Sequence, residues 1–110
     1  MEPGRYDITI HQRATFKRVI DLPIDLNGHE VYAQIWDGKR RNKVADFEIT
    51  ILDATLGQFE MKIDWQDTTL FKKAAFWDLQ VVYGNGDRDY WLEGEVTIDP
   101  GLTAKEDSDA

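Results

Sequence analysis

The 110-residue sequence has no cysteine, only two histidines and a single serine, Ser108. Without cysteine the chain has no disulfide, no thiolate nucleophile and no cysteine-ligated zinc site. Nucleophilic catalysis needs a nucleophile beside a positioned base. Ser108 lies in an acidic C-terminal stretch, and we expect His11 and His29 in solvated loops. We therefore predict that the protein is not an enzyme and carries no metal and no cofactor.

Long apolar runs and cations are also scarce. No run approaches the ~18 apolar residues of a membrane-spanning helix, and the opening Met1-Glu2-Pro3-Gly4 has no basic or apolar signal-peptide region. Thirteen Lys and Arg residues stand against twenty-one Asp and Glu, for a net charge of −8. A negative field repels phosphate backbones and anionic lipid. We therefore expect no direct nucleic-acid partner and no membrane partner.

What the sequence does have is a period-two alternation of apolar and polar residues, the period of a half-buried strand. The turns between the alternating segments include Asn27-Gly28, Asp37-Gly38 and residues 84–87. About seven short strands in a chain of this length predict an all-β, antiparallel immunoglobulin-like β-sandwich, with a small barrel as the alternative. The expected strands cover residues 8–10, 16–22, 31–36, 45–51, 59–63, 76–83 and 89–98.

The alternation also assigns residues to the core and divides the chain. One segment without alternation predicts a short helical turn over residues 67–72, with Asp67 as its cap. We expect the sandwich to span residues 1–100 and residues 101–110 to form an acidic tail. In the expected strands over residues 45–51, 76–83 and 89–98, the alternation assigns one face of each strand to the core. These faces are Ala45, Phe47, Ile49 and Ile51; Trp77, Leu79, Val81 and Tyr83; and Tyr90, Leu92, Val96 and Ile98.

Four tryptophans and one basic loop stand out as candidate contact residues. Trp77 falls on a core face, whereas Trp36 and Trp91 fall opposite the core faces. Interface centres are enriched in Trp, Tyr and Arg, and a basic loop in an acidic chain favours contact with an acidic neighbour, such as the tail of another copy. The predicted partner-binding residues are Tyr32, Trp36, Lys39, Arg40, Arg41, Trp65, Lys105, Glu106, Asp107 and Asp109.

Three segments resemble a small domain of tailed bacteriophages. Residues 10–16 (IHQRATF) and 23–36 (PIDLNGHEVYAQIW) are similar to the family's opening, QGxTF…PxDLTGYxxxAQIR. Residues 77–81 (WDLQV) resemble its YDLEV strand, and residues 90–103 (YWLEGEVTIDPGLT) its close, LLEGxVxVSPEVT. The family is the N-terminal immunoglobulin-like domain of phage baseplate upper proteins and of short stand-alone virion proteins. Trp36 stands where the family has Arg, which points to a different interface.

The resemblance implies a structural protein located in the virion, with other virion proteins and copies of itself as partners. On this hypothesis the chain is an adaptor or assembly module in the tail, baseplate or fibre-attachment region. Two alternatives stay open. One is a capsid decoration protein. The other is a glycan-binding module that recognises the host surface through Trp36 or Trp65, since exposed tryptophans also stack on sugars.

Overall fold

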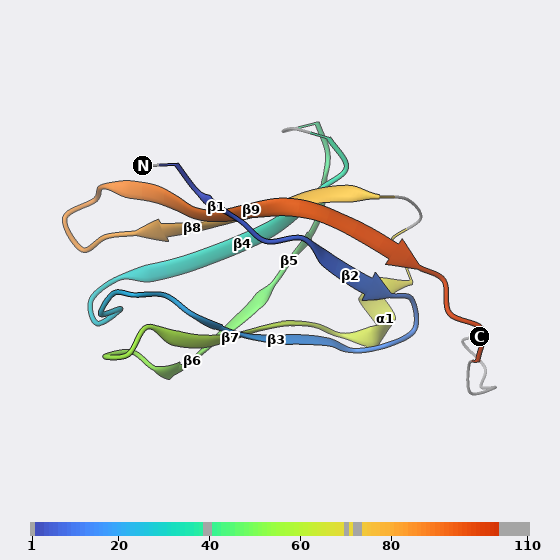
Figure 1. The fold of residues 1–110 in the computed structure, drawn as a ribbon, viewed down its shortest axis with the longest axis horizontal. Coiled ribbons are helices and arrows are strands. Elements are labelled where there is room, and N and C mark those ends of the chain that lie inside the picture. Colours follow the sequence, from blue (N-terminus) through green and yellow to red (C-terminus); the bar gives the residue numbers. More distant parts are fainter. Residues whose placement is uncertain (1, 39–40, 70, 72–73, 104–110) are drawn as a thin grey trace.

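Two packed β-sheets make up the fold of the computed structural model, which describes residues 2–38, 41–69, 71 and 74–103 (Figure 1). One sheet has the strand order β1-β9-β8-β4-β5, with β2 also paired to β9, and the other has the order β3-β7-β6. The elements are β1 (Gly4–Arg5), β2 (Ile8–His11), β3 (Phe16–Asp21), β4 (Glu30–Trp36), β5 (Lys43–Asp46), β6 (Glu48–Asp53), β7 (Gln58–Ile63), α1 (Trp65–Thr68), β8 (Ala75–Val82) and β9 (Arg88–Asp99).

This strand order is that of an immunoglobulin-like sandwich. The strands β3, β7 and β6 correspond to strands B, E and D of that fold, and β9, β8, β4 and β5 to G, F, C and C′. All pairings are antiparallel except those of β1 and β2, which run parallel to β9. The structure therefore confirms the predicted fold class. No helix in the described part of the chain is long and apolar enough to cross a membrane.

The core lies between the sheets and is built by the alternation seen in the sequence. On β8 the buried residues are Ala75, Trp77, Leu79 and Val81, and the last three were predicted. They face Phe59 and Met61 of β7, neither of which has any exposed surface. Because one face of each sheet is buried, a strand slipped by one residue would turn its apolar side chains outward. The apolar pattern thereby fixes the register that also positions the outer face.

The predicted strand over residues 45–51 is wrong as a single element. The chain forms β5 in the larger sheet and β6 in the smaller one, and it changes sheets at Phe47. The Phe47 ring packs 5.8 Å from both Phe16 and Trp77, so this buried side chain anchors the crossover. Ile51, assigned to the core, is 44 % exposed because β6 is an edge strand with a register shift at this point.

The predicted helical turn begins earlier than expected. Helix α1 is Trp65–Thr68, with Asp64 in the cap position and Asp67 inside the turn. The cause is the burial of Thr68 and Phe71, which lie three residues apart and both face the core. Residues 70, 72 and 73 of the predicted turn lie outside the described part of the chain.

On the last strand, the sequence analysis assigned Tyr90 and Trp91 to the wrong faces of the sheet. Gln80 pairs with Tyr90 but Leu79 pairs with Leu92, so β9 carries one extra residue, a β-bulge at Trp91. Beyond the bulge Tyr90 is on the outer face and 43 % exposed, although the alternation placed it in the core. Trp91, predicted to face outward, packs against the core instead, and its Nε1–H donates to the Tyr83 hydroxyl at 3.0 Å.

Candidate functional site

The outer face of the larger sheet carries an open groove of about 790 Å³. Its floor is formed by the outward-facing side chains of β4, β8 and β9, and Gly38 of the β4–β5 loop lies at its border. Five aromatic residues line it: Tyr32, Trp36, Phe76 and Tyr90 on the outer face, and the buried Trp77. Tyr32, Tyr90 and Phe76 are 48 %, 43 % and 39 % exposed, so one face of the sheet presents three exposed rings.

Strand register arranges these rings in two rows across the sheet. Tyr32 lies opposite Gln80, and Gln80 lies opposite Tyr90, which gives a row of two rings with an amide between them. Trp36 lies opposite Phe76 and forms the second aromatic row. The two rows are four residues apart along β4, a separation of about 13 Å at ~3.3 Å per residue.

Between the aromatic rows runs a polar row. Gln34 on β4 lies opposite Asp78 on β8, and Asp78 lies directly opposite Glu93 on β9. The Gln34 side chain is held in place, since its Nε2–H donates to Asp46 at 2.9 Å and its Oε1 accepts from the Trp36 indole at 3.2 Å. The groove thus has a carboxylate-bearing centre flanked by rings on both sides.

Charged groups at the groove's margins are partly engaged with each other. Arg5 pairs with Asp7 at 2.8 Å and with Glu95 at 3.4 Å, and these contacts raise the pKa of the Arg5 guanidinium. The Tyr32 hydroxyl donates to the Glu30 carboxylate, and this hydrogen bond raises the pKa of Tyr32. Tyr32 is 48 % exposed, so its ring is accessible to a partner.

The structure brings together only some of the predicted partner-binding residues. Tyr32 and Trp36 both line the groove, and Arg41 is exposed in the loop beyond its border. Trp65 is half-buried on α1 and is not among the residues that line the groove. The remaining predicted residues, Lys39, Arg40, Lys105, Glu106, Asp107 and Asp109, lie outside the described part of the chain.

Two comparisons with known proteins found no match for the chain. No protein-family model matches it, and no curated protein matches it. The resemblance to the phage domain therefore stays a prediction.

The sequence analysis named only Tyr32 and Trp36 among the residues that line the groove, and it missed Phe76, Asp78, Tyr90 and Glu93 among others. The alternation around Trp77 already implies that Phe76 and Asp78 point outward, so their position could have been found. Tyr90 could not, because the bulge at Trp91 reverses the alternation on that part of β9.

The two histidines differ from each other. His11 is exposed, as expected, with Nδ1 3.5 Å from Asp99. His29 is half-buried, against expectation: its ring packs edge-on to Tyr83 at 5.2 Å and its Nδ1 accepts the Gly84 N–H at 2.9 Å. His29 therefore connects the turn at Asn27-Gly28 to the turn over residues 84–87. Among the residues that the structure describes, no group of three His, Asp or Glu side chains is placed to hold a metal ion.

Proposed function

We propose that the chain is a non-enzymatic structural module of a tailed-phage virion, which joins other virion proteins through the groove on its larger sheet. The observation that carries this proposal is the set of three exposed rings, Tyr32, Phe76 and Tyr90, on one sheet face. Aromatic residues are enriched at protein interfaces, where each buries a large area at little cost in side-chain entropy. The virion location rests on the sequence resemblance, and it places the adaptor in the tail, baseplate or fibre-attachment region.

A sandwich suits such a role because the sheet holds the contact groups rigidly. The outward residues of β4, β8 and β9 are fixed by buried neighbours one position away, such as Ala33, Leu79 and Trp77. Little conformational entropy is lost when a rigid surface binds, so a modest interface can still be specific. Repeated copies of one small module could then form a regular layer.

A glycan-binding module is the second candidate. The row Tyr90, Gln80 and Tyr32 offers two rings on either side of an amide, groups that can stack on a sugar ring and bond its hydroxyls. In this case the groove would bind a host polysaccharide saturably. A capsid decoration protein is a variant of the first proposal with a different partner.

The test is to locate the chain in purified particles of the phage or prophage that encodes it. Mass spectrometry of the particles establishes whether the chain is present, and cryo-electron microscopy shows where. Density in the tail or baseplate is the expected result. Density on the capsid lattice would change the role to decoration, and absence from the particle would overturn the virion proposal.

A pair of variants tests whether the groove makes the contact. The double variant Tyr32→Ala with Tyr90→Ala removes both rings of one row, and we expect it to lower incorporation into particles severely. Val19→Ala with Leu56→Ala is the matched control, since these exposed apolar residues lie on β3 and in the β6–β7 turn of the smaller sheet. Equal incorporation of the two double variants would exclude the groove as the interface.

A further inference from the structure

Strand β3 forms a regular, open edge of the smaller sheet. Within the described part of the chain, the order β3-β7-β6 leaves one side of β3 without a neighbouring strand, and β3 pairs with β7 over six residues without a register shift. The outer strands β5 and β6 each carry such a shift, and β1 and β2 are only two and four residues long. Irregular or short edges are poor templates for another strand. Strand β3 is therefore the edge best suited to strand addition.

The hydrogen bonds of β3 show which of its residues face the open side. The Leu22 N–H donates to the Gly57 carbonyl at 2.9 Å, in continuation of the β3–β7 register. In an antiparallel pair, alternate residues bond to the neighbouring strand. The even-numbered residues of β3 therefore bond to β7. The N–H and C=O groups of Lys17, Val19 and Asp21 point away from β7, toward the open side.

The side chains of the same three residues lie on the outer face of the sheet. All three are exposed, and Val19 is 48 % exposed. Neither Lys17 nor Asp21 forms an ion pair with another residue that the structure describes, and the Asp21 carboxylate accepts one hydrogen bond from the Gln58 amide at 3.2 Å. The edge thus carries a cation, an apolar side chain and a carboxylate at alternate positions.

This order of side chains is self-complementary. When two copies of β3 run antiparallel about a two-fold axis at Val19, Lys17 of each copy lies opposite Asp21 of the other, and Val19 lies opposite its own counterpart. At each of these positions the backbone groups face the open side, so both main-chain hydrogen bonds of a bonded pair can form. A shift of the pairing by two residues would lose both pairs of opposite charge. The charges therefore specify one register.

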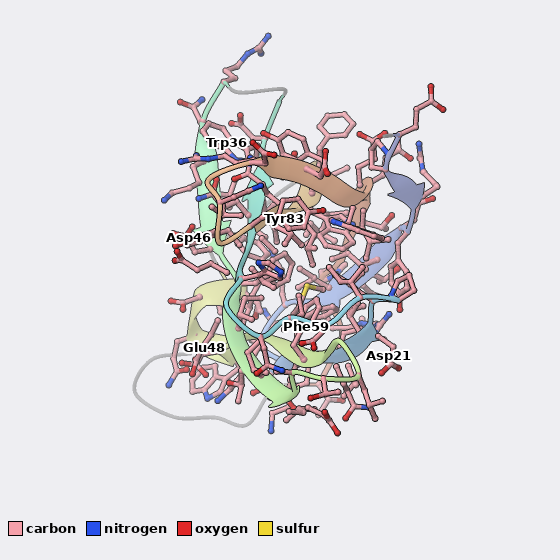
Figure 2. All side chains as sticks on the ribbon, turned by 90° about the vertical axis from the view of Figure 1, so that its left-hand side faces the viewer. Asp21, Trp36, Asp46, Glu48, Phe59 and Tyr83 are labelled. Atoms are coloured by element: carbon pink, nitrogen blue, oxygen red, sulfur yellow. The ribbon has the colours of Figure 1, made fainter. Side chains whose placement is uncertain are left out.

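From these observations we infer that the chain binds a second copy of itself through β3, so that the two smaller sheets join into one antiparallel sheet. Main-chain hydrogen bonds supply the affinity when a strand is added to a sheet edge, and opposite charges directly across from each other stabilise the pair. The inference goes beyond the proposed function, because it uses the other sheet. Figure 2 shows Asp21 away from Trp36 of the groove, which stays open to a different partner.

The experiment uses the full 110-residue chain. Sedimentation at concentrations up to about 1 mM measures the association, and hydrogen exchange followed by nuclear magnetic resonance locates it. We expect a monomer–dimer equilibrium in which higher concentration slows exchange at the N–H groups of Lys17, Val19 and Asp21, but not at the outer edge of β6. A chain that stays monomeric, or slowed exchange confined to another strand, would overturn the inference.

Charge reversals test the register. Lys17→Glu and Asp21→Lys each place like charges opposite each other at both ends of the pairing, and we expect about tenfold weaker dimerisation of either variant alone. A mixture of the two variants should form a heterodimer about as tight as the unmodified dimer, because both pairs of opposite charge are restored. Net charge predicts a different result, since the first variant is more negative than the unmodified chain and the second is less negative. A mixture that associates no better than either variant alone would contradict the proposed pairing.

Glu48→Lys is the matched control for Asp21→Lys. It makes the same change in charge on β6, and Figure 2 shows Glu48 and Asp21 at opposite margins of the smaller sheet, with Phe59 between them. We expect Glu48→Lys not to weaken dimerisation. Val19→Ala should dimerise nearly as well as the unmodified chain, because it keeps the main-chain bonds and both charge pairs. Equal weakening by Glu48→Lys and Asp21→Lys would exclude β3 as the specific contact and overturn the inference.

Discussion

Gly94 of β9 lies against the backbone of Tyr6 so closely that a β-carbon on Gly94 would stand 2.1 Å from the Tyr6 carbonyl oxygen. The two residues meet where the chain passes from β1 to β2, both of which pair with β9. The Tyr6 N–H also donates to the Glu93 carbonyl at 2.8 Å, which holds this passage in place. The glycine therefore permits the N-terminal segment to lie along the sheet that carries the groove.

Gly94→Ala should destabilise the protein by about 3 kcal/mol or more, because the obstacle is backbone and cannot rotate away. Chemical denaturation with urea measures the change. Gly4→Ala is the control from the same strand pair: its β-carbon would meet a Leu92 methyl group at 3.4 Å, an ordinary contact. A stable Gly94→Ala variant would mean that the segment between β1 and β2 is not held against β9.

The Tyr6 carbonyl also accepts a hydrogen bond from the Trp77 indole at 2.7 Å. Trp77 is only 2 % exposed, so this bond satisfies a polar group inside the core. Trp77→Phe removes the donor and part of the ring, and we expect a loss of about 2–3 kcal/mol in unfolding free energy. Phe76→Leu, one residue away but on the exposed face, should cost much less. Equal losses in urea denaturation would contradict the inward placement of Trp77.

Asp7 gives a prediction for pH. The Asp7 carboxylate accepts a hydrogen bond from the backbone N–H of Glu95 at 2.9 Å and another from the Arg5 guanidinium at 2.8 Å. These bonds hold the pKa of Asp7 in the folded protein below its ordinary value. A lowered folded pKa means that ionised Asp7 contributes stability above the unfolded pKa of about 4. That contribution is lost as pH falls through the folded value.

Asp7→Asn should therefore lower the urea midpoint at pH 7, and the difference from the unmodified protein should shrink below about pH 4. Asp21→Asn on β3, whose carboxylate accepts a bond from the Gln58 side chain at 3.2 Å, removes the same charge from the other sheet. We expect a smaller effect there. A difference between the unmodified protein and Asp7→Asn that grows toward acid pH would contradict the assignment.

The sequence was a good guide wherever one local pattern decided the structure. Alternation placed Trp77, Leu79 and Val81 in the core and Tyr32 outside it, because a half-buried strand has only two faces. The same pattern predicted Tyr32 and Trp36 as contact residues of one face. Turn chemistry separated the strands, since glycine at positive φ is needed at Gly28 and Gly86.

Features that depend on distant parts of the chain could not be predicted in this way. The bulge at Trp91 follows from how β9 pairs with β8, and it is this irregularity that turns Tyr90 into the groove. The change of sheet at Phe47 depends on core contacts with Phe16 and Trp77, which are distant in sequence. The opposition of Asp78 and Glu93 needs the register of two strands, which neither strand contains alone.

Thr68 shows how the shifted helix is held. Its hydroxyl is fully buried, accepts the Arg13 backbone N–H at 2.9 Å and donates to the Trp65 carbonyl at 2.7 Å. Arg13 has a φ of 64°, in the left-handed region that non-glycine residues seldom adopt. The hydroxyl therefore secures both α1 and the strained turn between β2 and β3.

Thr68→Val keeps the shape of the side chain but leaves the Arg13 N–H without its acceptor, and we expect a loss of about 1–3 kcal/mol. Thr69→Val is a close control, because the adjacent hydroxyl makes the same kind of bond to the Gln66 carbonyl at 2.7 Å but is exposed to water. That variant should change the urea midpoint little, since water replaces the lost partner. Equal losses for the two variants would mean that the helical bond, and not the buried link to Arg13, is what Thr68 contributes.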